Sequence, residues 1–267
     1  MDNLSYFTTS DGVRIAYRID GDLNKPVLVL SNSIGTTLRM WDGQVPELSS
    51  HFSMLRYDAR GHGASSVPDG PYSLARLGQD VLELMDTLGI AQAHFLGLSL
   101  GGIVGQWLGI HAPARIDRLV LSNTAPYLGP ADRFDAPIAE ALQADDMTTT
   151  AETFLHNWFP ASMFEAPNPV VERFRAMLLA TNRHGLVGSW RAVQDTDLRQ
   201  DIACIARPTL VIAGEHDTVT AASYSVQMAK TIPGATLLVL PAVHLSNVEF
   251  PREFGDAVVK FVLSPAA

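Results

Sequence analysis

Short apolar runs alternate with longer amphipathic segments along most of the chain. The runs are VLVLSNS (27–33), FSMLRYD (52–58), AHFLGLS (93–99), DRLVLSN (117–123), RPTLVIAG (207–214) and ATLLVLPAV (235–243). Several are continuously apolar, which is typical of parallel strands buried on both faces. Residues 73–89 instead repeat apolar side chains at helical spacing, with Ser73 as N-cap and Gly89 at the C-terminal end. Strands alternating with helices predict a parallel α/β sheet with right-handed crossovers.

The pattern changes at two places. Near the N-terminus, LSYFTTS and VRIAYRI flank the tight-turn pair Asp11-Gly12 and predict a hairpin. Residues 126–194 carry helical patterns without a strand pattern, and the sheet pattern then resumes. We therefore expect a core domain built from residues 1–125 and 195–267, with a helical cap, or lid, inserted at 126–194.

One serine interrupts the apolar stretch FLGLSLGGIVGQW, residues 95–107. Residues 97–101 fit the pattern G-x-S-x-G, at the end of a predicted strand and the start of a predicted helix. A serine on such a sharp turn is held above the sheet, and the Leu100 N–H at the helix N-terminus can donate to a developing oxyanion. A packed strand–helix turn would give the same five residues. The surrounding strand and helix favour Ser99 as a nucleophile.

A nucleophilic serine needs a base and an orienting acid, which in this architecture follow it in the order Ser, acid, His. Asp217 follows the strand TLVIAG, and His244 follows the last core strand. Both lie in loops beyond the carboxyl ends of strands, where sites of open α/β sheets form. We predict Asp217 as the acid and His244 as the base. Glu215 is the weaker choice, and Asn123 after the preceding strand is not an acid.

The second oxyanion donor is expected after the first parallel strand, where the chain reads VLVLSNSIGTTLRMW. Ser31-Asn32 stand where many serine hydrolases have His-Gly. The backbone N–H of Ser33 is the predicted donor and that of Ile34 the alternative, while Gly35 eases the turn.

The segment ARGHGAS contains a histidine, His62, but we interpret it as structural. Asp58, Arg60 and the two glycines are expected to form a turn with paired charges. The sequence has no HExxH, no CxxC and no glycine-rich phosphate loop, so neither a metal nor a nucleotide is indicated.

The composition of the chain limits the classes of partner and the cellular compartment that we expect. The 267 residues carry a net charge of −9, which argues against nucleic acid or an anionic membrane. The one cysteine, Cys204, excludes an intrachain disulfide and is expected to pack as a small apolar residue. MDNLSYFTT lacks the basic and apolar regions of a signal peptide, and no apolar run is long enough to span a membrane. We expect a cytoplasmic protein, with a homo-oligomer left open.

Five segments carry a more specific resemblance: SNSIGTTLRMWDGQ, RYDARGHGASSVPDGPYSL, GLSLGGIVGQWLG, LVLSNTA and HLSNVE. In these the chain resembles the α/β-hydrolases, and specifically the 3-oxoadipate enol-lactonases of bacterial aromatic degradation. The resemblance covers residues 5–125 and 205–263 and is weakest in the cap. It implies the α/β-hydrolase fold, with a mostly parallel eight-stranded sheet, helices on both faces and a helical cap. It also supports the triad of Ser99, Asp217 and His244, and it implies no cofactor.

A small-molecule lactone is the expected partner. Such a substrate would carry an acetate side chain, whose carboxylate is best bound by an arginine. The candidate substrate-binding residues are Arg133, Arg183 and Arg191 for the carboxylate, and Ile34, Trp158 and Trp190 for the pocket lining. Taken singly, each arginine fits a solvated surface position better than a substrate contact, and each tryptophan fits packing inside the cap at least as well as the pocket lining.

Other functions fit the same residues. A carboxylesterase, a hydrolase of C–C bonds in ring-cleavage products and a cofactor-free perhydrolase would use the same triad. A ligand sensor built on a hydrolase scaffold is a different class, which an intact triad does not exclude.

Overall fold

Eight strands form one sheet in the order β1-β2-β4-β3-β5-β6-β7-β8 in the computed structural model, which describes residues 4–265. The strands are β1 (Ser5–Thr8), β2 (Arg14–Asp20), β3 (Val27–Ser31), β4 (Ser53–Tyr57), β5 (Ala93–Leu98), β6 (Ile116–Ser122), β7 (Thr209–Gly214) and β8 (Thr236–Leu240). The first two form the predicted hairpin, and β2 is also antiparallel to β4. All the other neighbours are parallel, so the predicted mostly parallel, eight-stranded sheet is confirmed.

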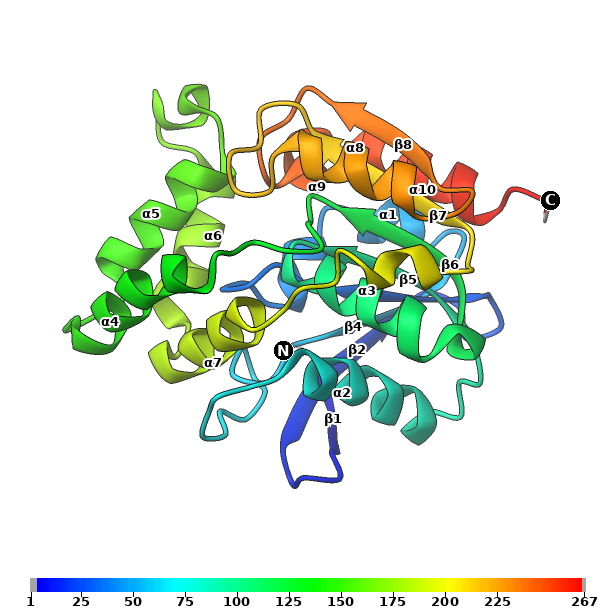
Figure 1. Cartoon of the computed structure of the whole chain (residues 1–267), viewed down its shortest axis with the longest axis horizontal. Coiled ribbons are helices and arrows are strands. Elements are labelled where there is room, and N and C mark those ends of the chain that lie inside the picture. The colour runs from blue at the N-terminus through cyan, green and yellow to red at the C-terminus, as the bar shows by residue number, and fades with distance from the viewer. Residues whose placement is uncertain (1–3, 266–267) are drawn as a thin grey trace.

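Helices cover both faces of this sheet (Figure 1). They are α1 (Val45–Leu48), α2 (Leu74–Thr87), α3 (Leu100–His111), α8 (Ala222–Thr231), α9 (Ser246–Glu249) and α10 (Pro251–Val262). Helix α2 begins where the sequence predicts, because the Ser73 side chain accepts a hydrogen bond from Arg76 N–H. Its apolar stripe, which includes Leu77, Val81 and Leu84, is buried.

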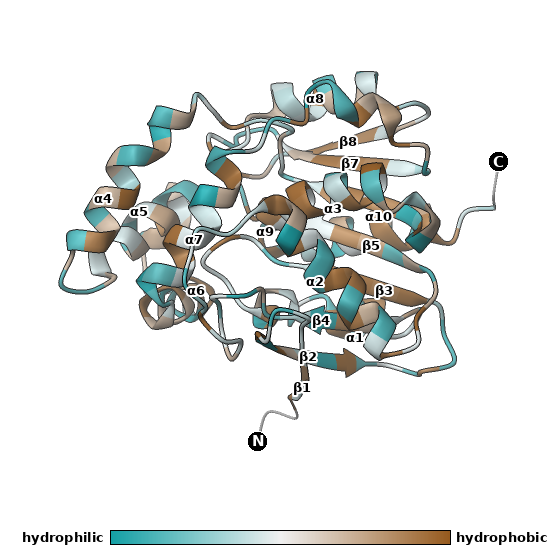
Figure 2. Cartoon of the chain, turned by 60° about the horizontal axis from the view of Figure 1, so that its bottom comes forward, coloured by the Kyte–Doolittle hydropathy of each residue, from teal (hydrophilic) through white to brown (hydrophobic). Residues whose placement is uncertain are grey.

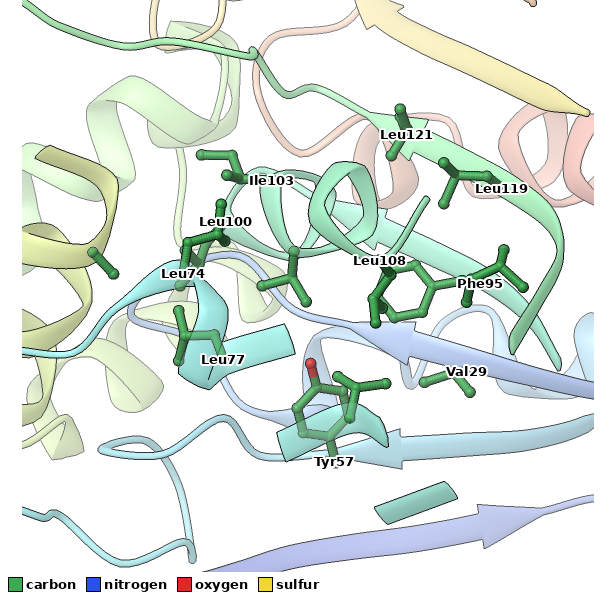
Figure 3. Packing of buried hydrophobic residues seen from close by; sticks show 14 of the residues in the cluster. Val29, Tyr57, Leu74, Leu77, Phe95, Leu100, Ile103, Leu108, Leu119 and Leu121 are labelled. Atoms are coloured by element: carbon green, nitrogen blue, oxygen red, sulfur yellow. The ribbon is translucent and has the colours of Figure 1, made fainter. Parts of the chain in front are cut away.

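Two apolar layers hold the helices to the sheet. Successive residues of a strand point to opposite faces, so Phe95 of β5 joins the layer under α2 and α3, and Leu96 joins the layer under α10. The central strands β3 and β5 are hydrophobic along most of their length (Figure 2). Figure 3 shows the first layer, where Leu77 and Leu108 reach from their helices toward the strands. Burying each such side chain contributes roughly 1.5–3 kcal/mol.

Four helices gather at one end of the sheet, to the left in Figure 1. They are α4 (Asp135–Gln143), α5 (Thr148–Trp158), α6 (Pro169–Ala180) and α7 (Arg183–Gln194). Tyr127 and Asp197 form an isolated bridge where the chain enters and leaves this region. The four helices lie within the segment 126–194, for which we predict a cap. The division of the chain into core and cap stays a prediction.

The structure also tests the expectations for Cys204 and for membrane spans. Cys204 is exposed at the end of the short helix η5 (Asp201–Cys204), so the prediction that it packs in the interior is wrong. None of the helices within residues 4–265 has the length and hydropathy needed to cross a bilayer.

Candidate active site

Ser99 occupies the turn between β5 and α3. Its φ of 57° and ψ of −117° are rare for a residue with a side chain and cost free energy that the surroundings must offset. The Ser99 N–H donates to the Ser122 carbonyl at 3.0 Å, and the Thr124 hydroxyl donates to the Ser99 carbonyl at 2.8 Å. These bonds hold the strained residue in place, so that its hydroxyl lies on the wall of a cavity.

The glycines on either side of Ser99 permit two close backbone approaches. A Cβ added to Gly97 would lie 2.1 Å from the Gly101 carbonyl oxygen, and one added to Gly101 would lie 2.2 Å from that of Ser31. Any larger residue at either position would push strand and helix apart. The pattern G-x-S-x-G is therefore required here by the geometry of the turn.

Asp217 and His244 meet although 27 residues separate them in the chain. Asp217 follows β7 and His244 follows β8, and the parallel pairing of these strands brings the two loops together. His244 Nδ1 lies 2.9 Å from Asp217 Oδ2, and both side chains are fully buried. Because the carboxylate accepts the Nδ1 hydrogen, the neutral imidazole presents Nε2 as an acceptor.

Several donors keep Asp217 ionised. Burial alone raises the pKa of this carboxyl group. The charge and hydrogen bond of His244, the Thr220 N–H and the Asn123 amide outweigh burial and hold the pKa well below its usual range. The N–H groups of Val219 and Thr220 donate to Oδ1 at 2.8 and 2.9 Å. A carboxyl group with so many donors stays ionised, so it is suited to orient a histidine and poorly suited to carry a proton.

Ser99 and His244 line one cavity of about 230 Å³. Within residues 4–265, His244 Nε2 is buried and has no hydrogen-bond partner. A buried acceptor without a partner has a cost, unless a ligand or a reacting proton satisfies it. His244 Nε2 therefore has no hydrogen bond to the Ser99 hydroxyl. The hydrogen bond between a nucleophile and its base is often long before substrate binds, so this does not exclude the pair. The arrangement is that of a base facing the space in which a substrate would lie.

Asn123 is not an acid, but the structure places its side chain against Asp217. Its Nδ2 donates to Asp217 Oδ2 at 3.0 Å and to the Val243 carbonyl at 3.1 Å. Its Oδ1 accepts from the hydroxyls of Ser122 and Ser246, which fixes the orientation of the amide. The available signal was its position after β6, at the same edge of the sheet as Asp217 and His244.

The structure distinguishes the two candidates for the second oxyanion donor, Ser33 and Ile34. The Ser33 N–H already has an acceptor, Met40 Sδ at 3.2 Å, and Ser33 does not line the cavity. Ile34 does line it, together with Ser99 and Leu100. Across the described part of the chain, the backbone N–H groups of Ile34 and Leu100 have no acceptor. The geometry thus disagrees with the choice of Ser33 and favours the alternative, Ile34.

Residues of the segment 126–194, for which we predict a cap, also line the cavity. They include Arg133, Phe134, Phe154, Asn157, Trp158 and Trp190. Trp158 is 1% exposed and also packs edge-on against Phe154 and Phe174, so it serves both the cap interior and the cavity wall.

Only one of the three candidate arginines reaches the cavity. Arg191 lies 3.6 Å from Asp135, hydrogen-bonds Gln194 and lines a different depression, so the structure does not support a substrate contact. Arg183 donates to the carbonyls of Ala144 and Asp145. Arg133 lines the cavity and, within residues 4–265, has neither an ion pair nor a hydrogen bond from its side chain.

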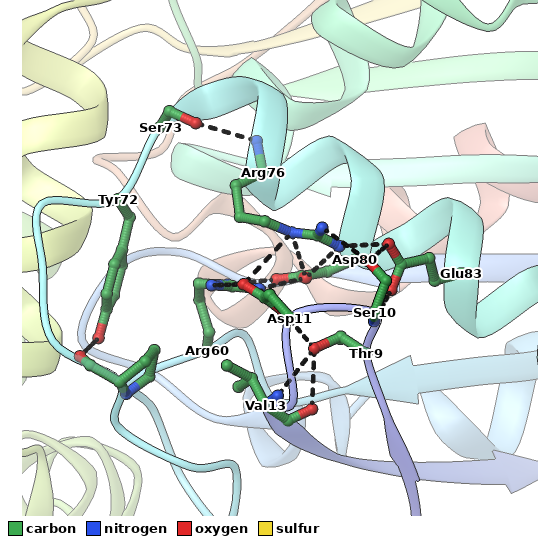
Figure 4. Close-up of polar contacts among 11 residues, drawn as sticks. Thr9, Ser10, Asp11, Val13, Arg60, Tyr72, Ser73, Arg76, Asp80 and Glu83 are labelled. Carbon is green, nitrogen blue, oxygen red and sulfur yellow. Dashed lines mark hydrogen bonds and ion pairs between the residues drawn. The ribbon is translucent and has the colours of Figure 1, made fainter.

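Arg60, in the loop after β4, is structural, as predicted. Its guanidinium pairs with Asp80 at 2.6 Å and with Asp11 at 2.9 Å, and Arg76 extends the network (Figure 4). The hydrogen bond from Arg60 lowers the pKa of Asp11 to about 2. Asp58 accepts the backbone N–H groups of Leu38 and Ala64.

A larger depression of about 440 Å³ lies between the short helix η1 (Leu38–Trp41) and α6. Neither Ser99 nor His244 lines it, so its size does not make it the reaction site. Of the residues described, no three histidine, cysteine, aspartate or glutamate side chains are grouped so as to hold a metal ion.

Comparison with known proteins defines the class. A family model described as the alpha/beta hydrolase fold matches residues 26–251. A hydrolase from Pseudomonas aeruginosa PA01, of known structure, superposes with a TM-score of 0.97 and is 66% identical, covering 98% of this chain and 99% of its own. The protein is an α/β-hydrolase, and the predicted fold class is confirmed.

Two further relatives narrow the family. The 3-oxoadipate enol-lactonase 2 of Acinetobacter baylyi is 38% identical over 250 residues, which cover 94% of this chain and 93% of the relative. The structure of the enol-lactonase from Burkholderia xenovorans LB400 is 39% identical, with a TM-score of 0.94 over 97% of this chain and all of that one. The chain belongs to the 3-oxoadipate enol-lactonase family and is a hydrolase of ester or lactone substrates.

Proposed function

We propose that this protein hydrolyses 3-oxoadipate enol-lactone to 3-oxoadipate, as part of the bacterial degradation of aromatic compounds. One observation supports this most strongly. A single cavity is lined by Ser99, His244, Leu100, Ile34 and Arg133; among residues 4–265 the N–H groups of Leu100 and Ile34 have no acceptor and the Arg133 side chain has no partner. The kinship with enol-lactonases supports the choice of substrate.

In the proposed first step, Ser99 Oγ attacks the lactone carbonyl carbon and its proton passes to His244 Nε2. Asp217 stabilises the imidazolium through the 2.9 Å contact with Nδ1. The Leu100 and Ile34 N–H groups bind the oxyanion, and each such donor contributes about 3 kcal/mol in related enzymes.

Collapse of this intermediate breaks the ring C–O bond and leaves an acyl-enzyme on Ser99. The leaving oxygen is an enolate, which is a better leaving group than an alkoxide and takes the proton back from His244. The resulting enol tautomerises to the ketone. Water, deprotonated by His244, then attacks the acyl carbon, and Ser99 departs with the proton. No step needs a cofactor.

Arg133 is the proposed partner of the substrate's acetate carboxylate. It belongs to the short helix Ala131–Phe134, in the predicted cap, and lines the same cavity as Ser99 and Leu100. A guanidinium without a partner of its own can bind a carboxylate through two parallel hydrogen bonds. It would also offset the chain's net charge of −9, which otherwise disfavours an anionic substrate.

A comparison of three substrates tests the proposal. We expect kcat/KM for the enol-lactone, followed by loss of its ultraviolet absorbance, to exceed that for p-nitrophenyl acetate and for a vinylogous diketone. A preference for the acetate would indicate a carboxylesterase, and a preference for the diketone a C–C hydrolase. Binding of the lactone with at most one turnover would indicate a sensor.

A further inference from the structure

Two buried histidines, His62 and His94, have no role in the proposed mechanism, and His62 is the more deeply buried of the two. His62, only 2% exposed, lies in the loop after β4. Its Nε2 accepts a hydrogen bond from the Gly35 N–H at 3.0 Å, and its Nδ1 lies 3.2 Å from the Arg60 carbonyl oxygen. One neutral tautomer satisfies both contacts, with the hydrogen on Nδ1 donated to Arg60 and the lone pair of Nε2 turned toward Gly35.

Gly35 is the neighbour of Ile34 in a tight turn. The Thr36 N–H donates to the Ser33 carbonyl at 3.2 Å, and Gly35 has a φ of +74°, which together define a four-residue turn with Ile34 and Gly35 at its centre. The N–H groups on both sides of Ile34 have acceptors, Met40 Sδ for Ser33 and His62 Nε2 for Gly35. The turn is thus held on both sides of Ile34, whose own N–H has no acceptor among residues 4–265.

Leu178 and Thr181 of the predicted cap contact the same turn at Gly35. A Cβ on Gly35 would lie 2.9 Å from Leu178 Cδ2, and the Thr181 hydroxyl lies 3.3 Å from the Gly35 carbonyl oxygen. Gly185 packs directly on the backbone of Gly61, the residue before His62. The contact between His62 and Gly35 is therefore enclosed by protein, where a hydrogen bond is stronger than in water.

We propose that His62 is a positioning residue, whose Nε2 holds the Gly35 peptide so that the Ile34 N–H is directed at the oxyanion. This rests on the proposed role of Ile34 but not on the identity of the lactone, because any ester carbonyl would use the same donor. Burial lowers the pKa of the His62 imidazole, which favours the neutral form that the contact requires.

Two substitutions separate this role from simple packing. His62→Leu fills similar space without an acceptor, whereas His62→Gln places an amide oxygen near the position of Nε2. Because a misplaced catalytic group costs up to about 100-fold, we expect kcat of His62→Leu on p-nitrophenyl acetate to fall roughly 10- to 100-fold with KM little changed. His62→Gln should recover most of that loss. His94→Leu is the matched control, a buried histidine at the opposite end of β5 from Ser99, and should leave kcat unchanged.

A tetrahedral inhibitor gives a readout that packing alone would not move. Phenylboronic acid forms a tetrahedral adduct with a serine nucleophile, and its oxygen would accept from the Ile34 N–H. Its affinity should fall in His62→Leu by about the same factor as kcat. Equal kcat losses in the leucine and glutamine variants, or unchanged boronate affinity, would overturn the proposal. If the leucine variant does not fold, a folded His62→Gln with a loss above about 100-fold overturns it by itself. Use of p-nitrophenyl acetate keeps this test separate from failure of the lactonase proposal.

Discussion

His244 Nδ1 donates to Asp217 Oδ2 across 2.9 Å, in a place where neither side chain reaches solvent. The same carboxylate also accepts from the Thr220 hydroxyl and the Asn123 amide. This is more than a pairwise contact, because each donor makes the ionised form of Asp217 more stable. The imidazole is thereby held in the one tautomer that a general base needs.

Replacing the acid should therefore affect both catalysis and the pH dependence of stability. Asp217→Asn offers His244 no carboxylate and is expected to lower kcat by about 10⁴-fold, as in other triads. Because folding lowers the pKa of Asp217, its ionisation stabilises the wild-type protein fully above about pH 4, the unfolded value, and less as the pH falls below it. Urea unfolding of both proteins between about pH 3 and 8 measures this. A stability difference that grows on acidification would contradict the assignment.

Asn123 provides a test of the acid's surroundings. Asn123→Asp replaces a donor 3.0 Å from Asp217 Oδ2 by a second carboxylate, and two adjacent carboxylates cannot both ionise freely. We expect kcat at neutral pH to fall roughly 10- to 100-fold, since the replaced group orients the acid. Asn247→Asp is the matched control, because that buried asparagine contacts Gln44 and Met40 instead. Equal effects of the two substitutions would show that Asn123 has no special role.

The choice between Ser33 and Ile34 can be decided by removing one N–H. Ile34 occupies the turn position that favours proline, so Ile34→Pro deletes the N–H and can keep the turn. Loss of one oxyanion donor should lower kcat by about 10²- to 10³-fold. Ile34→Val keeps the N–H and the apolar lining and should stay close to wild type. Full activity in the proline variant would return the role to Ser33.

The arginine in the cavity should determine the preference for an anionic substrate. Arg133→Ala is expected to raise KM for the enol-lactone roughly 10- to 100-fold, the loss of one charge-assisted contact. A neutral butenolide without the acetate group should be unaffected. Arg191→Ala, which removes an arginine outside the cavity, serves as control. The assignment is wrong if both lactones lose equally.

The sequence predicted the sheet well because buried parallel strands leave a local signal. The start of the run VLVLSNS coincides with the start of β3, and the turn at Ser99 follows β5 directly. Asp217 and His244 could be chosen because each follows a strand. Contacts made across the fold left no such signal. Nothing local shows that Met40 Sδ occupies the Ser33 N–H, or that Arg191 turns toward Asp135.

Asn123 is a further residue whose contacts are made across the fold and leave no local signal in the sequence. An amide cannot act as the acid of a triad, so the residue type alone gives no reason to expect a role for Asn123. Its side-chain amide donates to Asp217 and to the Val243 carbonyl and so links their two loops. These contacts exist only because the fold brings the three loops together at one edge of the sheet.

We propose that Ser99 carries out lactone hydrolysis in the cavity that it shares with His244. The most direct test of this proposal is multiple-turnover hydrolysis of 3-oxoadipate enol-lactone, followed by loss of ultraviolet absorbance, with wild type and Ser99→Ala. We predict sustained turnover by the wild type and a loss of roughly 10⁶-fold in kcat for the alanine variant, as when the serine of another triad is removed. Full activity of Ser99→Ala, or a wild type that binds the lactone without turning it over, would contradict the account.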